Sequence, residues 1–232
     1  LNDPEGVRSG DENAIARLTE GLMLGGFAMQ WSKSSRPASG AEHQFSHLWD
    51  MQNHTHNGDA PSHGFKVGIG TLAVATLYEH LLQQPIEQLD IDACCAAWPA
   101  IEQKEQRIRD LFRSYDFTEK AVEEVRAKYI SPDELRAQLE RLRASWPELK
   151  MALQRQLLPA AELKRMLKTA GAPTEPEEIG ISRERLRESF EQAYYIRRRF
   201  TVLDLAIRTG HLKSGLEALF GPGGTWAPAG KS

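Results

Sequence analysis

Cysteine is scarce in this chain of 232 residues, which contains two, Cys94 and Cys95, side by side. Neighbouring residues rarely reach disulfide geometry, so a disulfide framework of the kind found in small secreted domains is excluded. The pair is expected to be two reduced, buried thiols of a cytoplasmic protein, and the alternative is a vicinal thiol metal site.

Long apolar runs are also missing. No stretch approaches the roughly 18 to 20 apolar residues that a helix needs to cross a bilayer, and the first residues lack the pattern of a signal peptide. The formal net charge is −3. The chain has no overall basic field, so we expect neither a membrane span nor a nucleic-acid partner. The short cluster Arg197, Arg198 and Arg199 is expected on a solvated helix face, and the alternative is an anion or interface contact.

Helical patterns account for most of what is present. Apolar residues follow helical spacing over 11–30, where Gly25 and Gly26 leave room for a close neighbour. A second short helix is expected over 41–50 and a loop over 51–62. Residues 64–82 begin like a strand but run too long for one and end in helix formers, so they predict a buried helix that starts near His63.

Helix-capping signals are clear in the second half of the chain. Ser131 and Glu134 form a capping box with a proline between them, Gly171 ends a helix, and Ser182 can begin the next one. Hairpin turns, a period of two and internal repeats are all missing. The sequence therefore predicts an all-α domain of eight to ten helices over residues 1–220, followed by a flexible tail over 221–232.

The histidines are concentrated in one region. The segment SSRPASGAEHQFSH holds His43 and His47 four residues apart, on one face of the expected helix, and His63 follows in PSHGFKVGIG. Imidazole is the commonest nitrogen ligand for metals. Two histidines and a carboxylate would make a catalytic metal site with an open position, while the remaining histidine faces the substrate. The alternative is chance in a His-rich stretch that also holds His54 and His56. His80 and His211 are expected to be surface or capping residues.

Four segments together resemble the sn-glycerol-1-phosphate dehydrogenases, particularly their bacterial members: SSRPASGAEHQFSH, HGFKVGIGT, AGAPTEPEEIGISRE and IRRRFTVLDLA. These enzymes belong to the superfamily of dehydroquinate synthase and the iron-containing alcohol dehydrogenases. The resemblance covers nearly the whole chain and is sharpest over 21–82 and 162–209. It implies the multi-helical C-terminal domain of the dehydroquinate synthase-like fold.

The resemblance also implies a site and a reaction. Family members hold zinc or nickel with one Asp and two His; the two metal histidines match His43 and His63, and the histidine that contacts substrate matches His47. The implied reaction, a step of phospholipid biosynthesis, is reduction of dihydroxyacetone phosphate to glycerol 1-phosphate by NADH or NADPH in a cytoplasmic enzyme, expected to be a homodimer. The metal would act as a Lewis acid on the ketone oxygen, and the catalytic His47 would hydrogen-bond the substrate or relay a proton.

The chain departs from the family pattern in what it lacks. Family members begin with a nucleotide-binding α/β domain that contains a Gly-rich turn. This sequence shows no such turn, so we expect that domain to be missing from it. No residue matches the metal-binding Asp. Asp50, seven residues after His43, is interpreted as a structural carboxylate or one that supports a metal ligand. A second departure is the pair Phe65 and Lys66, where many family members have a smaller or acidic pair. Lys66 is expected to be exposed, and the alternative is contact with the substrate phosphate.

The chain is therefore expected to be part of a larger enzyme, cut from it or encoded without its partner, because it starts abruptly with LNDPEGVRSGDENA and has no initiator Met. Alone it should bind metal weakly and be inactive. One alternative is a metal-dependent dehydrogenase of another small polyol, such as glycerol. The other is a non-catalytic helical interaction module that uses the charged, amphipathic stretch 101–168 as its partner surface.

Overall fold

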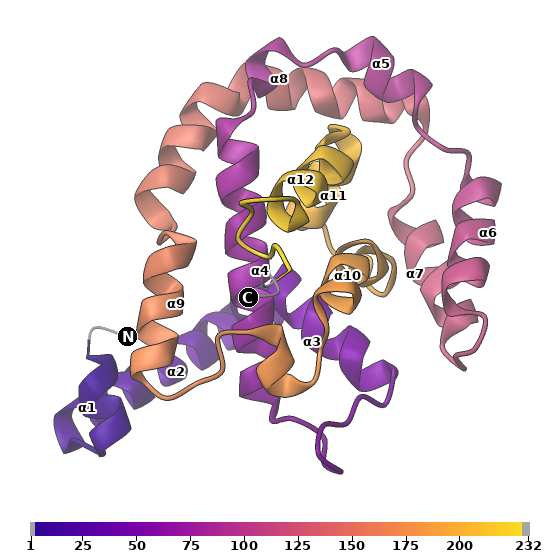
Figure 1. Ribbon diagram of the computed structural model, residues 1–232. Coiled ribbons are helices and arrows are strands. Elements are labelled where there is room, and N and C mark those ends of the chain that lie inside the picture. Colours follow the sequence, from indigo (N-terminus) through magenta and orange to yellow (C-terminus); the bar gives the residue numbers. More distant parts are fainter. Residues whose placement is uncertain (1–2, 229–232) are drawn as a thin grey trace.

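The structure is a computed structural model that describes residues 3–228. Over these residues the chain forms helices and no strand, which confirms the all-α prediction (Figure 1). The α-helices are α1 (Pro4–Ser9), α2 (Glu12–Ser32), α3 (Ala41–Met51), α4 (His63–Gln83), α5 (Ile91–Ala96), α6 (Ile101–Phe112), α7 (Thr118–Lys128), α8 (Pro132–Gln156), α9 (Ala160–Thr169), α10 (Arg183–Tyr195), α11 (Val202–Arg208) and α12 (His211–Phe220). Three short 3₁₀ turns, η1 (Arg36–Ala38), η2 (Ile86–Gln88) and η3 (Pro176–Ile179), complete the described elements.

Local sequence explains where several helices begin. The Ser62 hydroxyl accepts a hydrogen bond from the Phe65 backbone N–H, so α4 starts at His63 as predicted. The capping box of Ser131 and Glu134 is present at the start of α8. Ser182 caps α10 in the predicted way. The helices expected over 11–30 and 41–50 correspond to α2 and α3.

The hydrophobic core is built around α4, which crosses the middle of the molecule (Figure 1). Its buried face packs against Phe45 and Trp49 of α3 and belongs to the same core cluster as Phe190 of α10. The aromatic rings of Phe45 and Phe190 meet edge to face with centroids 4.9 Å apart. A smaller cluster joins α5 to the first turns of α8. Because α3 and α4 share so much of the core, the position of each helix end relative to the other is strongly constrained.

The expected tail begins with packed residues. Trp226, within the segment 221–232 that was predicted to be flexible, is fully buried, and its Nε1–H donates to the Thr76 hydroxyl at 3.0 Å. The aromatic ring therefore holds this part of the tail against α4. The last four residues of that predicted tail, 229–232, lie outside the described residues.

Among the described residues, α2 does not have the close neighbour that its glycines suggested. A Cβ atom at Gly25 or Gly26 would meet none of the described atoms within 4 Å. Leu22, Phe27 and Trp31 are exposed, Trp31 by 90%. Helical spacing correctly predicted the helix, because periodicity reports an apolar stripe, but it does not report what covers that stripe.

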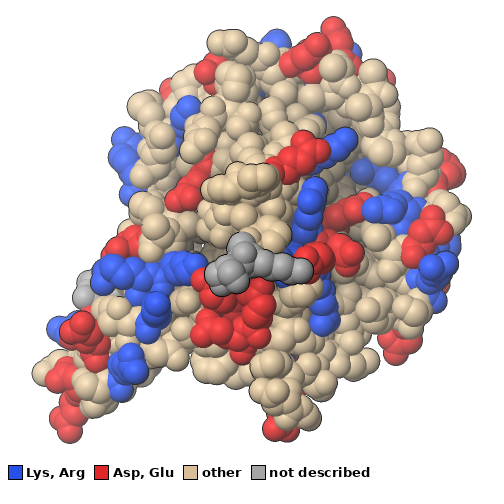
Figure 2. Space-filling model, viewed as in Figure 1, with Lys and Arg blue, Asp and Glu red and all other residues tan. Residues whose placement is uncertain are grey.

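The prediction of buried thiols needs correction. Cys94 and Cys95 are free, as expected, but they are half-buried and not buried. His80 and His211, which were expected to be surface or capping residues, are half-buried, and His211 is the first residue of α12. Burial lowers the pKa of each. No helix in the described part of the chain is both long enough and apolar enough to cross a membrane. Acidic and basic side chains are interspersed over the face in Figure 2, in keeping with the lack of an overall basic field.

Candidate metal and substrate site

The three histidines singled out by the sequence lie together. His43 and His47 project from α3, and His63 opens α4 after the loop 52–62. The ring centroids of His43 and His63 are 5.3 Å apart, and His47 lies 6.2 Å from His43 and 6.1 Å from His63. His63 is exposed, whereas His43 and His47 are half-buried. The cluster is thus open to solvent on the side of α4.

One nitrogen of His43 and one of His63 are held by neighbouring side chains. Nδ1 of His43 lies 2.8 Å from Oε1 of Glu42, and Nδ1 of His63 lies 3.1 Å from the hydroxyl of Ser46, which is buried. A carboxylate only accepts, so Nδ1 of His43 carries the hydrogen and Nε2 presents its lone pair. The Ser46 hydroxyl permits the same tautomer in His63. A hydrogen-bonded Nδ1 is the usual arrangement of a metal-binding histidine.

The distance between these two rings suits a shared cation. With a metal–nitrogen bond of about 2.0 Å and a tetrahedral angle of about 109°, two ligating imidazoles place their centroids about 5.2 Å apart. The pair His43 and His63 matches this separation, and His47 is farther from both. Within residues 3–228, however, no three His, Cys, Asp or Glu side chains form a complete metal-binding group. The described residues therefore offer two nitrogen donors and not a full ligand set.

The environment of His47 favours a neutral ring. Burial lowers the pKa of His47, and the positive charge of Arg197 lowers it further, followed by smaller effects of the other two histidines. A neutral imidazole carries one N–H donor and one lone pair, so it can hydrogen-bond a substrate oxygen and act in proton transfer.

Lys66 is buried, which contradicts the expectation that it is exposed. It is only 4% exposed, and its ammonium group forms an ion pair with the carboxylate of Asp50. The helical repeat of α4 turns Lys66 inward towards α3, and Asp50 at the end of α3 is its counter-ion. Asp50 thus acts as a structural carboxylate, and the pair holds the two helices of the histidine cluster together.

The neighbouring histidines of the loop have structural partners of their own. His54 is buried, with Nε2 2.7 Å from the carbonyl oxygen of Ile179 and Nδ1 2.8 Å from the guanidinium of Arg185. The backbone of His56 pairs with that of Asp59 in a tight turn. The His-rich composition of this loop is therefore separate from the cluster of three.

A hollow of about 230 Å³ adjoins His47. It is lined by Ser35, Ser39, Gly40, Gln44, His47, Arg197 and Arg199. The three consecutive arginines were expected on a helix face, and this prediction is wrong. They lie between helices, because α10 ends at Tyr195 and α11 begins at Val202. The sequence analysis did not identify Gln44, Ser35 and Ser39 as lining residues. The arginine cluster was the feature that pointed to this hollow, through the alternative that it contacts an anion.

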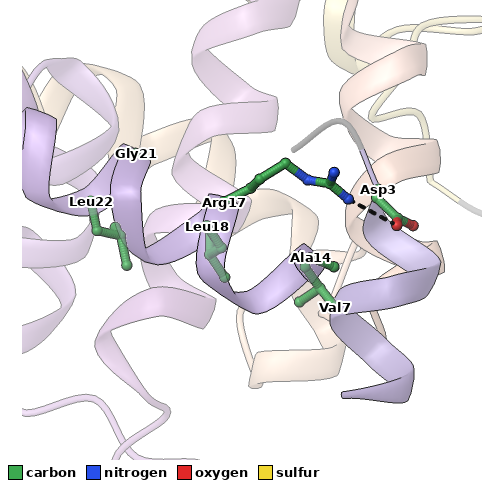
Figure 3. A pocket seen from close by; sticks show the side chains of 7 residues that line it. All are labelled: Asp3, Val7, Ala14, Arg17, Leu18, Gly21 and Leu22. Carbon is green, nitrogen blue, oxygen red and sulfur yellow. Dashed lines mark ion pairs between the residues drawn. The ribbon is translucent and has the colours of Figure 1, made fainter. Parts of the chain in front are cut away.

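A second hollow, between α1 and α2, contains none of these histidines. Figure 3 shows it lined by Val7, Leu18 and Leu22, with Arg17 directed towards Asp3 at 3.7 Å. Its single cation already faces a carboxylate, so it provides no comparable charged site.

Sequence comparison finds relatives with one recurring name. A glycerol-1-phosphate dehydrogenase [NAD(P)+] of Geobacillus stearothermophilus is 28% identical over 199 residues, which cover 85% of this chain and 39% of that protein. Dehydrogenases of the same name from Halalkalibacterium halodurans and Pyrococcus horikoshii are each 43% identical over shorter stretches, of 77 and 79 residues, which cover 33% and 34% of this chain and 19% and 21% of those proteins. The chain is homologous to these dehydrogenases.

The predicted resemblance to glycerol-1-phosphate dehydrogenases is thereby confirmed. The chain spans about two fifths of the length of the relative from Geobacillus stearothermophilus. No protein-family model matches the chain, and no solved structure matches it. The homology therefore supports the family resemblance, while the roles of individual residues are argued from the geometry above.

Proposed function

We propose that this chain is the metal-binding helical domain of an NAD(P)-dependent glycerol-1-phosphate dehydrogenase, in which His43 and His63 bind one divalent cation through Nε2. The observation that carries the proposal is the 5.3 Å separation of two rings whose Nδ1 atoms are both held by neighbouring side chains. The homology of the chain to dehydrogenases with this name supports it independently.

In the proposed reaction each residue has a distinct task. His43 and His63 would hold a divalent cation, zinc or nickel by family resemblance, which would supply Lewis acidity at the ketone oxygen of dihydroxyacetone phosphate. Glu42 and Ser46 hold the two rings through their Nδ1 atoms. His47 remains neutral and donates or accepts a hydrogen bond at the substrate oxygen. A nicotinamide cofactor would supply the hydride, so the protein contributes binding and orientation.

Other parts of the site are proposed to lie outside these 232 residues, in the portion of the longer relatives that does not align with them. These parts are the carboxylate ligand and the NAD(P)-binding domain, so the chain alone is expected to bind metal weakly and to be inactive. A homodimer and a cytoplasmic location stay predictions from the family resemblance, as does the placement of the chain in the C-terminal half.

Metal analysis of the complete enzyme tests the assignment. His43→Ala and His63→Ala should each abolish metal retention measured by elemental analysis, because each removes one of two nitrogen donors. His47→Ala should retain the metal and lose turnover. His56→Ala, which changes a loop histidine outside the cluster, serves as the matched control and should affect neither. Unchanged metal content in His43→Ala and His63→Ala would remove the assignment, and metal loss in His47→Ala would contradict its role.

A further inference from the structure

The hollow beside His47 has the composition of an anion site. Its lining contains two arginines and no aspartate or glutamate. Glu42, the carboxylate next to this segment in sequence, lines an apolar hollow on the side of α4, and its Oε1 accepts a hydrogen bond from the Gly40 backbone N–H at 2.7 Å. The side chains that line the hollow of about 230 Å³ themselves carry net positive charge, which favours an anion.

The three consecutive arginines differ in how they are already used. Arg198 is committed to Glu124, which it meets with two guanidinium nitrogens at 3.0 and 2.8 Å. Arg199 donates to the carbonyl oxygen of Ser39 at 2.8 Å and to the Ser35 hydroxyl, which fixes its guanidinium at the rim. Arg197 makes no ion pair or hydrogen bond with any residue in the described range, and it lines the hollow. The Arg197 guanidinium is thus available to a ligand.

The buried amide of Gln44 independently indicates that a ligand binds in the hollow. It is only 2% exposed, and its Nε2 has no hydrogen-bond partner among the described residues. Its Oε1 accepts from the Thr201 hydroxyl at 3.4 Å, which orients the amide. A buried N–H group without an acceptor is unfavourable, and an oxygen of a ligand in the hollow would satisfy it.

The beginning of α3 already faces a carboxylate. Gly40 is the N-cap residue and supplies no side-chain cap, and its own backbone N–H donates to Oε1 of Glu42 at 2.7 Å. The Glu42 carboxylate therefore offsets the attraction of this helix end for a second anion. Gly40 also lines the hollow, together with Gln44 and Arg197, which are the two residues whose donor groups lack partners in the described part of the chain.

We propose that this hollow binds the phosphate group of the substrate, through Arg197 and Gln44. The inference rests on the proposed function in one respect, the identity of the substrate. His47 lines the hollow and also belongs to the histidine cluster. One small molecule can therefore place its phosphate in the hollow and a nearby oxygen at the cluster. The site selects a phosphate monoester of a three-carbon ketone over an unphosphorylated polyol such as glycerol.

Selectivity in the complete enzyme provides the first test. Arg197→Gln and Gln44→Leu should lower kcat/KM for dihydroxyacetone phosphate, Arg197→Gln on the order of 10²-fold, with little change for dihydroxyacetone, because only the former has the phosphate. Arg198→Gln is the matched control, an adjacent arginine whose partner is Glu124, and should keep the ratio of the two values. Equal losses for both ketones in Arg197→Gln would overturn the proposal.

Direct binding of inorganic phosphate separates this inference from the proposed function. Titration calorimetry should show saturable phosphate binding by the complete enzyme, weakened at least tenfold in Arg197→Gln and unchanged in Arg198→Gln. Equal binding by the wild-type enzyme and Arg197→Gln, or no binding by either, would overturn the anion site. Loss of the metal assignment in the His43→Ala and His63→Ala experiments would leave the phosphate result standing, so the two failures are distinguishable.

Discussion

Gly70 of α4 lies directly against the backbone of Glu42 at the start of α3. A Cβ atom at position 70 would come within 2.5 Å of the Glu42 carbonyl oxygen. This close approach joins the two helices that carry the histidine cluster, since His43 follows Glu42 and His63 begins the helix of Gly70.

Gly70→Ala should therefore destabilise the protein, although alanine is the better helix former. We expect a loss of about 1–3 kcal/mol in the free energy of unfolding, because the backbone of α3 must move to admit the methyl group. Gly68→Ala in the same helix is the matched control, since its Cβ would meet only a Leu167 methyl at 4.0 Å. That variant should gain about 0.5–1 kcal/mol. Urea denaturation of both variants makes the comparison, and a stabilised Gly70→Ala would disprove the close approach.

Glu42→Ala and Ser46→Ala should weaken metal binding without removing a ligand. Each takes away the partner of one Nδ1 atom, so the ring loses its fixed orientation and its basicity falls. Partners of this kind are typically worth about 10- to 100-fold in metal affinity. Competition with a chelator measures the change in the complete enzyme, and Glu87→Ala on the exposed surface is the control. Affinity equal to that of the control in both variants would show that the two contacts do not support the ligands.

The Lys66–Asp50 pair should respond asymmetrically to substitution. Lys66 is buried, whereas the Asp50 side chain is 44% exposed. Asp50→Asn leaves a buried ammonium without its counter-ion and should cost about 1–3 kcal/mol of stability, while Lys66→Met leaves a carboxylate that water can reach and should cost less. Chemical denaturation of both single variants and the double variant gives the coupling, and equal losses in the two singles would contradict the burial of Lys66.

Trp226 should stabilise the fold despite its place near the end of the chain. Trp226→Ala removes a fully buried ring and should cost about 3–5 kcal/mol, and Trp226→Phe should cost less because it keeps most of the ring and loses the bond to Thr76. Trp31→Ala is the control, because Trp31 is 90% exposed and should change stability by about 0.5 kcal/mol or less. Thermal unfolding distinguishes these values, and a neutral Trp226→Ala would show that the tail does not pack in solution.

Acid should weaken the fold through Glu124. Hydrogen bonds from Arg198 hold the pKa of Glu124 well below its ordinary value of 4.5, at about 2. A carboxylate whose pKa is lower in the folded state contributes stability above the unfolded value and loses it as pH falls through the folded one. Stability measured by urea midpoints should therefore drop between about pH 4.5 and 2, and Glu124→Gln should make this drop smaller. Glu217→Gln, on an exposed face, should follow the parent protein; identical profiles for the Glu124 and Glu217 variants would contradict the assignment.

Much of the helical framework follows from the sequence. Serine caps begin α8 and α10 at predicted residues, α4 starts at His63 as predicted, and apolar spacing predicts α2 and α3. These features depend on residues within one or two turns of each other, so local sequence is sufficient to determine them. The same local reasoning placed His43 and His47 on one face of a helix and identified His63 as the residue that would have to meet them.

Long-range packing decided the rest, because it depends on residues that no local window contains. Lys66 is buried since α4 packs its face against Asp50 of α3, and Trp226 reaches Thr76 from 150 positions away. The hollow beside His47 needs three segments, around Ser35, Gln44 and Arg197, to converge. The amino-acid sequence thus determined which side chains exist and which turns carry them, whereas the free energy of burying apolar surface in one shared core decided which of them face each other.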